Sequence, residues 1–521
     1  MSKPRRSALI LVLCLTAVAL AACAAPQTPE LPTPTYTSKP TLSRTPTRAP
    51  SLSAAVSPST EATATPTALA ALPTSPFPTA TSTAILIPTP SVTPTMLGDC
   101  AEIWQSGYYR MYADFKTKTK RFDCMIVQAS DVVIDCDGHS IQGMERQGHG
   151  FWIRRYGFPI LQTPNNIEIR NCKVTNARDG VFAEAGTNIY IHDNDFSNNY
   201  DDTDNRRYGI FLGLTEGGGI HLDHVQGARI ENNTTNNEAI GIDIRNSDSV
   251  FIRNNTATNN SAWGVNLLNT QHSEVDGNTL KDNVRYCTWG SGVVGPGCDA
   301  GAVILQDGSD YNVVRNNTIS GQNGSGVFVK AHNLRCGDDN LIQNNQITDA
   351  MYNAVELGFC AGNKIIGNEI AGNGSTYVGI SFGFDSKTEI RDNKISNMRN
   401  QGIDSWNSRD AIIQGNQITN SREGVLFHWG QWDPKQFGFL APSPDQYASR
   451  NNIITNNILR DNSVAGIHLL NSIQNQIMGN TFANNGRNVW IEGKNDGDVI
   501  SGLYTCTACR LLAMRAVSSP Q

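Results

Sequence analysis

The sequence predicts an all-β solenoid, in which short strands form coils that stack on one another. The first observation behind this prediction is an asparagine that recurs in one local phrase, an apolar residue followed three positions later by Asn, as in Ile252 and Asn255. Most steps between these asparagines are 22 to 28 residues, and the others are 39 to 41 residues. A near-constant period of this length is typical of solenoids. The recurring residues are Asn194, Asn233, Asn255, Asn278, Asn317, Asn345, Asn368, Asn393, Asn416, Asn457 and Asn480.

The second observation is the alternation of apolar and polar residues around a second apolar position. That position lies ten residues before the first one and usually follows a glycine, as Ile242 follows Gly241 and precedes Ile252. Period-2 alternation is typical of a half-buried strand. One repeat therefore contains a strand, a turn, a strand, an Asn corner, a short strand and a loop. We expect the Asn to tolerate the left-handed backbone of a sharp corner and its amide to bond to equivalent amides in a ladder.

These coils resemble the right-handed parallel β-helix of the pectate-lyase-like superfamily, which includes NosD-type and carbohydrate-active members. The resemblance rests on the Gly-Ile-x-Ile and Ile-x-x-Asn-x-Ile phrases and covers roughly residues 131–492. It implies about 13 coils of about 23 residues, rising about 4.8 Å per coil. The repeat residues are structural, so the resemblance is specific for the fold and weak for the activity.

The N-terminus has the features of an export signal. Lys3, Arg5 and Arg6 precede an apolar run at residues 8–22 that is too short to span a membrane. Residues 20–23 resemble the bacterial lipobox, which implies cleavage before Cys23 and lipid attachment to its sulfur. A secretory signal with an incidental cysteine is the alternative. Loss of residues 1–22 removes three positive charges and moves the net charge from −6 to −9, which argues against nucleic-acid binding.

Composition divides the chain into five parts. Residues 1–22 are the signal, and residues 23–97 form a Thr/Pro/Ser/Ala-rich tether that cannot bury a core. Residues 98–130 are predicted to cap the solenoid at its N-terminal end, 131–498 to form it, and 499–521 to follow as a tail. We expect a monomeric lipoprotein on the outer side of the cell membrane or at the cell surface, attached to the membrane through Cys23 alone.

Ten cysteines remain outside the signal, and an oxidising compartment favours disulfides between them. Cys136 and Cys172 both stand where the phrase would place its Asn, so in adjacent coils they would lie about 4.8 Å apart. Cys506 and Cys509 could pair or form half of a metal knuckle, and we favour the structural interpretation. The predicted pairs are Cys100/Cys124, Cys136/Cys172, Cys287/Cys298, Cys336/Cys360 and Cys506/Cys509.

Three repeats carry insertions, at residues 199–218, 284–300 and 428–450. They flank the strand that follows the glycine, and extra length in a solenoid often surrounds its binding side. In the superfamily that the chain resembles, this strand forms the floor of a polysaccharide cleft.

Alternation predicts the outward-facing residues of that strand. In three consecutive coils they are Phe182 and Glu184, His221 and Asp223, and Asp243 and Arg245. Such clustering of titratable groups is typical of acid/base chemistry. For a lyase or epimerase acting on a uronate, Arg245 would neutralise the substrate carboxylate, His221 oriented by Asp243 would be the base, and Asp223 or Glu184 the acid. For a hydrolase, Asp223 would act with Asp243 or Glu184. The structural alternative is a charge ladder that stabilises the sheet.

Further candidates lie towards the C-terminus. Glu356 and Asp404 flank Ser381 on successive coils, without a basic partner in their row. Trp429 and Trp432 in the third insertion would either stack on sugar rings or form a small core of their own. We predict no metal centre, although Asp and Asn residues make Ca²⁺ a candidate cofactor.

The sequence thus predicts a protein that binds an extracellular polysaccharide, and in its enzymatic version also cleaves or epimerises it. The first alternative is a non-catalytic rod that binds glycan or serves adhesion or envelope structure. The second is a NosD-like maturation factor for a metal enzyme, which the lack of a His/Met cluster suited to copper disfavours.

Overall fold

The computed structural model describes residues 93–119, 122–200, 217–288, 294–297, 300–330, 336–428, 448–493, 495–502 and 504–505. Cys23, Trp429, Trp432, Cys298, Cys506 and Cys509 lie outside these ranges, as does the side chain of Cys287. None of the described residues forms a helix long and apolar enough to cross a membrane.

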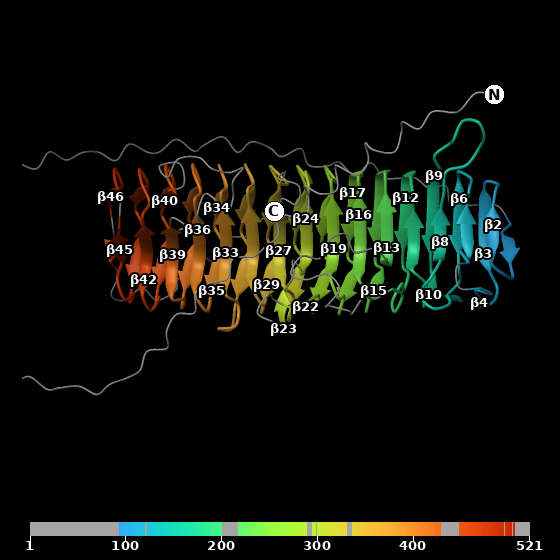
Figure 1. The fold of residues 1–521 in the computed structure, drawn as a ribbon, viewed down its shortest axis with the longest axis horizontal. Coiled ribbons are helices and arrows are strands. Elements are labelled where there is room, and N and C mark those ends of the chain that lie inside the picture. The colour runs from blue at the N-terminus through green and yellow to red at the C-terminus, as the bar shows by residue number, and fades with distance from the viewer. Residues whose placement is uncertain are drawn as a thin grey trace, which may run out of the picture. The chain divides into compact units, whose positions relative to one another are not determined.

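The described residues form a right-handed parallel β-helix, as predicted. Each coil contributes one strand to each of two long parallel sheets, and most coils add a third, short strand (Figure 1). Sheet A has 16 strands: β1 (Thr95–Leu97), β3 (Gly107–Met111), β6 (Val132–Asp135), β9 (Asn165–Arg170), β12 (Gly186–His192), β14 (Val225–Glu231), β17 (Asp248–Arg253), β20 (Glu274–Asp276), β25 (Val313–Arg315), β28 (Leu341–Gln343), β31 (Lys364–Ile366), β34 (Glu389–Arg391), β37 (Ile412–Gln414), β40 (Ile453–Thr455), β43 (Gln476–Met478) and β46 (Val499–Ser501).

Sheet B has 15 strands and is the sheet whose strands follow the glycines: β2 (Ala101–Ile103), β5 (Met125–Val127), β8 (His149–Ile153), β11 (Asp179–Ala183), β13 (Gly218–Asp223), β16 (Ile240–Arg245), β19 (Trp263–Leu268), β24 (Gly301–Gln306), β27 (Ser325–Lys330), β30 (Asn353–Gly358), β33 (Val378–Gly383), β36 (Gln401–Trp406), β39 (Glu423–His428), β42 (Ala465–Leu470) and β45 (Val489–Glu492).

The third set, sheet C, has a 3-stranded part and an 11-stranded part, joined by single bridges through Asp195. Its strands are β4 (Phe115–Lys116), β7 (Ser140–Gln142), β10 (Lys173–Thr175), β15 (Thr234–Asn236), β18 (Thr256–Thr258), β21 (Thr279–Lys281), β26 (Thr318–Ser320), β29 (Gln346–Thr348), β32 (Glu369–Ala371), β35 (Lys394–Ser396), β38 (Gln417–Thr419), β41 (Ile458–Arg460), β44 (Thr481–Ala483) and β47 (Tyr504–Thr505).

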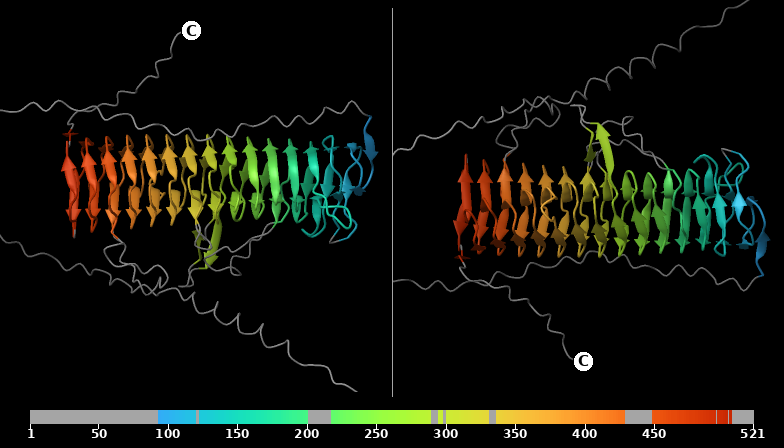
Figure 2. Two further views of the ribbon diagram at one scale, coloured as in Figure 1. Left: turned by 90° about the horizontal axis from the view of Figure 1, so that it is seen from above. Right: turned by 90° about the horizontal axis from the view of Figure 1, so that it is seen from below.

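Strand pairing extends beyond residues 131–498 at both ends. Strands β1 to β5 lie before residue 131, in the ranges predicted as tether and cap, and β46 and β47 lie in the range predicted as tail. An antiparallel pair, β22 (Arg285–Thr288) and β23 (Val294–Gly297), belongs to the second insertion. This pair projects from the side of the stack (Figure 2).

The core lies between the three sheets because one face of each strand points inward. In sheet B the inward residues of adjacent coils stand in register, as Ile242 does with Val265, and their side chains are fully buried. Stacking equivalent apolar residues coil upon coil gives one continuous core. A single coil could not bury its apolar residues alone, because it has no neighbour to cover them.

The Asn ladder runs through the stack at the corner after sheet A. Asn255 Nδ2 donates to Asn278 Oδ1 at 3.0 Å and to the carbonyl of Ile230 at 2.8 Å, while its backbone N–H donates to the same Oδ1 at 2.9 Å. The side chain thereby satisfies buried backbone groups that the corner leaves unpaired. The prediction for the corner backbone was wrong in one respect. The left-handed conformation belongs to the preceding residue, such as Asn254 with a φ of 54°, because the ladder residue must direct its amide inward.

The coils contain further ladders besides the one that the sequence predicts. Hydrogen bonds of 2.9 and 3.1 Å link the side-chain amides of Asn260, Asn283 and Asn323. Asn312 and Asn340 donate their backbone N–H groups to the side-chain amide oxygens of the next coil. These additional ladders stand at other corners of the same coils, where the same unpaired backbone groups arise.

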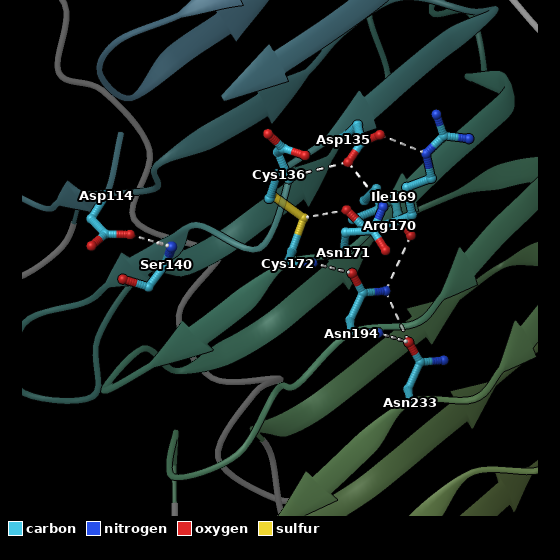
Figure 3. Close-up of a disulfide and its surroundings, with 11 residues drawn as sticks. Asp114, Asp135, Cys136, Ser140, Ile169, Arg170, Asn171, Cys172, Asn194 and Asn233 are labelled. Atoms are coloured by element: carbon cyan, nitrogen blue, oxygen red, sulfur yellow. Dashed lines mark hydrogen bonds and ion pairs between the residues drawn. A yellow bond between two sulfur atoms is a disulfide. The ribbon is translucent and has the colours of Figure 1, made fainter. Parts of the chain in front are cut away.

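Three of the predicted disulfides are formed: Cys100–Cys124, Cys136–Cys172 and Cys336–Cys360. Figure 3 shows Cys136–Cys172 directly beside the ladder. The backbone N–H of Cys172 donates to Asn194 Oδ1 at 2.9 Å, and Asn194 continues to Asn233. The bridge therefore replaces the asparagine amides in the coils that precede Asn194, as the sequence phrase predicted.

Candidate functional site

The outer face of sheet B presents two rows of side chains that run along the stack, one residue per coil. Strand register places them without ambiguity, since parallel pairing aligns equivalent positions of successive coils. The first row is Trp152, Phe182, His221, Asp243, Asn266, Ile304, Phe328, Glu356, Ser381, Asp404, Leu426, His468 and Trp490. The second row, from β13 onward, is Asp223, Arg245, Leu268, Gln306, Lys330, Gly358, Gly383, Trp406, His428, Leu470 and Glu492.

The predicted N-terminal cluster lies together on this face. His221 stands opposite Asp243, and Asp223 opposite Arg245. Arg245 donates to Asp243 Oδ2 from Nε at 2.9 Å and lies 2.7 Å from it through a second nitrogen, and Asn266 Nδ2 donates to Oδ1 at 2.8 Å. Asp243 and Arg245 are 3% and 8% exposed. The two charges therefore neutralise each other in a buried pair.

His221 lies at the edge of that pair. Its Nε2 is 3.9 Å from Asp243 Oδ2, which is beyond hydrogen-bonding distance, and its ring meets Phe182 edge-on with the centroids 5.0 Å apart. This nitrogen is buried and makes no hydrogen bond in the structure. The imidazole is thus held by packing, with one ring nitrogen directed at a carboxylate that it does not reach.

Asp223 and Glu184 bond to other partners. His224 Nδ1 lies 2.9 Å from Asp223 Oδ1, and Asn246 Nδ2 donates to the same oxygen at 2.9 Å. Glu184 follows β11 directly and accepts a hydrogen bond from the backbone N–H of Arg155 at 2.8 Å. The predicted residues therefore share one face but divide into three small groups.

Two further His–carboxylate pairs on the same face were missed by sequence analysis. His149 Nδ1 lies 2.9 Å from Asp179 Oδ2, and the His149 ring stacks on Phe182. Towards the C-terminus, His468 Nδ1 lies 2.8 Å from Glu423 Oε1. Burial raises the pKa of Glu423, but hydrogen bonds from His468 and Gln401 outweigh burial and leave the pKa below its ordinary value. The partners in each pair come from different coils, so only the strand register could have revealed them.

The predicted C-terminal residues lie beside an aromatic platform, which we define as Phe359, Phe384 and Trp406. Phe359 stacks on Phe384 with the centroids 4.8 Å apart, and Phe384 meets Trp406 edge-on at 5.1 Å. The Trp406 ring lies against Gly383, where any Cβ would collide with it. One coil earlier, a Cβ on Gly358 would meet nothing within 4 Å, so the surface is open there.

Carboxylates lie in the row next to Gly358, Gly383 and Trp406. Glu356, Ser381 and Asp404 form one row, as predicted. Glu356 Oε2 accepts a hydrogen bond from Ser325 Oγ at 3.1 Å, and His428 Nε2 lies 3.0 Å from Asp404 Oδ1. The basic partner that this cluster lacks in its own row is thus supplied diagonally by the next coil. The arrangement offers an aromatic surface, two carboxylates and an imidazole on one face of sheet B.

Two sequence families match the chain. Residues 333–502 match the family described as "Right handed beta helix region". Residues 135–283 and 214–375 match the family described as "Periplasmic copper-binding protein (NosD)". No curated protein matches this sequence. The formed disulfides and the match to a periplasmic family indicate an exported protein.

Solved structures resemble the chain at a distance. The A-module of the Azotobacter vinelandii mannuronan C-5 epimerase AlgE4 is 14% identical, with a TM-score of 0.45, over 76% of this chain and 91% of that one. The A-module of AlgE6 is 13% identical, with a TM-score of 0.42, over 78% and 92%. Tailspike protein 3 of bacteriophage CBA120 is 12% identical, with a TM-score of 0.41, over 81% and 59%. These likenesses are too distant to transfer an activity.

The match to a copper-binding family raises the question of a copper site. Within the described ranges, no group of three or more His, Cys, Asp or Glu residues is placed to hold a metal ion. The four histidines in the strands of sheet B, His149, His221, His428 and His468, each lie beside a carboxylate and come from different strands. Copper favours several imidazole or thioether ligands converging on one point. The described residues do not offer that arrangement, and we derive no step through copper.

Proposed function

This chain belongs to the right-handed parallel β-helix superfamily, and we propose that it binds an extracellular polysaccharide along the outer face of sheet B. The observation that carries the proposal is the aromatic platform that ends in Trp406, with Glu356 and Asp404 in the neighbouring row. A sugar ring has an apolar face that stacks on an aromatic side chain, and hydroxyl groups at its rim that bond to carboxylates.

The regular spacing of the face supports a polymeric ligand. The rows repeat once per coil, about 4.8 Å apart, so an extended chain laid along the stack meets a similar position at every step. The N-terminal groups around His221 and the C-terminal carboxylates beside Trp406 lie on this same face. We therefore propose a long binding surface whose strongest contacts are near the aromatic platform.

His221 favours a catalytic version as a second candidate. An imidazole nitrogen that makes no hydrogen bond can accept a proton, and Nε2 of His221 is such a nitrogen. In this version His221 removes the proton α to a uronate carboxylate, and Asp223 or Glu184 protonates the departing oxygen in a lyase, or the opposite face of the carbanion in an epimerase. Arg245 would have to leave Asp243 before it could neutralise the substrate. Asp223 with Asp243 or Glu184 remains the proposal for a hydrolase.

The cellular arrangement is also a proposal. We propose that Cys23 carries the lipid anchor, that the chain from residue 23 to the start of β1 at Thr95 forms the tether, and that the exported monomer lies on the outer side of the membrane. The composition of residues 23–97 and the lipobox-like residues 20–23 support this arrangement.

The test is a binding screen of the full-length chain against acidic and neutral polysaccharides. We expect Trp406→Ala to weaken saturable binding by roughly two- to tenfold, because stacking on one aromatic ring contributes about 0.5–1.5 kcal/mol. Tyr112→Ala is the matched control, because Tyr112 is 59% exposed and follows β3 of sheet A, away from the outer face of sheet B. Equal losses in the two variants, or no saturable binding to any polysaccharide, would refute the proposal.

The same samples test the catalytic version. Unsaturated uronate absorbance that disappears in His221→Ala would establish a lyase, and new reducing ends without that absorbance would establish a hydrolase. Proton exchange at the uronate, followed by NMR, reports an epimerase. If the parent forms no product and His221→Ala binds the polysaccharide as the parent does, the function is that of a non-catalytic binding rod.

A further inference from the structure

A loop between β8 and β9, residues 154–164, presents apolar side chains to solvent. Phe158, Ile160 and Leu161 are 96%, 79% and 63% exposed. Single exposed apolar residues are ordinary, but three large ones within four positions form a patch with a specific use. The teal loop rises clear of the sheets above β9 in Figure 1.

The loop has a defined shape. Tyr156 and Gln162 exchange backbone hydrogen bonds of 3.1 and 2.6 Å and close its base. The Tyr156 hydroxyl lies 3.2 Å from Ser130 Oγ, which ties the base to the preceding coil. Gly157 adopts a φ of +92°, a left-handed conformation that turns the chain into the tip. The closed base therefore holds the apolar side chains of the tip in solvent, away from the hydrophobic core.

The charged side chains of the loop itself are of one sign, while Glu184 of the next coil accepts the Arg155 backbone N–H at the base of the loop. Residues 154–164 contain Arg154 and Arg155, both exposed, and no Asp or Glu. The Arg154 guanidinium lies over the Trp152 ring, 4.8 Å from its centroid. The loop thus combines an apolar tip with positively charged residues near the sheet. Tyr156 adds an aromatic ring with a polar end. An anionic lipid surface matches each of these features in the same order, from acyl chains to headgroups.

We propose that this loop docks the protein on an anionic lipid bilayer, with Phe158, Ile160 and Leu161 entering the acyl region and Arg154 and Arg155 contacting the headgroups. The proposal goes beyond polysaccharide binding, and it does not depend on the ligand of sheet B. Docking would give the protein a second membrane contact in addition to a lipid anchor. Two weak membrane contacts on one molecule reinforce each other through effective concentration.

The experiment places a reporter at the tip. In the full-length chain, Phe158→Trp adds one fluorophore, and its contribution is the difference from the parent spectrum. With phosphatidylglycerol-containing vesicles, we expect the added emission to shift to shorter wavelength and to fall at least twofold when the acyl chains are brominated. Tyr377→Trp is the matched control, because Tyr377 is 47% exposed and lies in the loop before β33, far along the stack.

A second variant tests the charges. Arg154→Glu with Arg155→Glu, made in the Phe158→Trp background, should abolish the quenching in anionic vesicles and leave the secondary structure unchanged. Quenching absent from Phe158→Trp, or equal in the Tyr377→Trp control, would overturn the proposal. An emission shift that follows protein concentration would assign the tip to a second copy, and one that follows added polysaccharide would assign it to the ligand of sheet B. Either result would also overturn membrane docking.

Discussion

His192, on the outer face of sheet A, links protonation to stability. Its Nε2 lies 3.2 Å from Glu168 Oε1 and its Nδ1 2.6 Å from Asp193 Oδ2. Burial lowers the pKa of His192, but hydrogen bonds to these two carboxylates outweigh burial and leave the pKa above its ordinary value. For Glu168, burial raises the pKa, and the hydrogen bond with His192 together with the Arg170 charge brings it below its ordinary value.

These directions predict a window of pH. A raised His pKa gives stability that is fully present below about pH 6.5 and is lost as the pH rises through the folded-state pKa. A lowered Glu pKa gives stability that is present above about pH 4.3 and is lost as the pH falls through the folded-state pKa. We therefore expect His192→Gln to lower the free energy of unfolding most between about pH 4.3 and 6.5, by about 1.5–3 kcal/mol.

Denaturant unfolding across roughly pH 4 to 9, the range in which the two groups titrate, measures this difference. His272→Gln is the control, because the His272 side chain is 50% exposed although it also lies beside a carboxylate, Asp248. A difference in the free energy of unfolding between the parent and His192→Gln that keeps growing as the pH rises above about 6.5 would contradict the assignment.

The Asn ladder behaves as one element of the fold, and its central members should be the most costly to lose. Asn317 Nδ2 donates to the carbonyl of Val275 and to Asn345 Oδ1, both at 2.9 Å, and its Oδ1 accepts from the backbone N–H of Asn278. Asn317→Ala leaves the buried N–H and carbonyl without partners. At about 1–3 kcal/mol for each unsatisfied buried group, we expect a loss of about 3 kcal/mol in the free energy of unfolding.

The neighbouring residue provides the control for this ladder prediction. Asn316 has a φ of 53°, and its side chain donates to Asp276 at an exposed site. Asn316→Gly keeps the left-handed backbone and removes only that contact, so its free energy of unfolding should change by less than about 1 kcal/mol. Equal losses for Asn317→Ala and Asn316→Gly, measured by denaturant unfolding, would show that the buried amide does not stabilise the stack.

Sequence predicted the ladder, the disulfides beside it and the rows of sheet B, because each depends on local rules. An Asn at a constant offset from an apolar residue and a period of two are enough to place His221 opposite Asp243. The sequence could not predict that Arg245 pairs with Asp243 and is not left open to a ligand, since this depends on rotamers and burial at the outer face. The His149–Asp179 pair was missed because its members belong to different repeats and neither stands in the phrase that defined the coils.

At the level of the whole stack, each coil packs only on the coil before it and the coil after it. A terminal coil has one neighbour, so unfolding should begin at the ends and advance inward. The two ends also differ. Among the described residues, Cys100–Cys124 ties the first coils together, whereas no disulfide lies beyond Cys360. The C-terminal end should therefore open first.

Amide hydrogen exchange of the native protein measures this order. We expect the amides of β28 in the middle of sheet A to exchange most slowly, those of β3 to be intermediate, and those of β46 to exchange on the order of a hundred times faster than those of β28. Reducing the disulfides should accelerate exchange in β3 and leave β46 unchanged, because β3 lies between Cys100 and Cys124 whereas β46 lies beyond Cys360, the last bridged cysteine of the described residues. Uniform protection from β3 to β46 would mean that the stack unfolds in a single step and that its coils are coupled well beyond nearest neighbours.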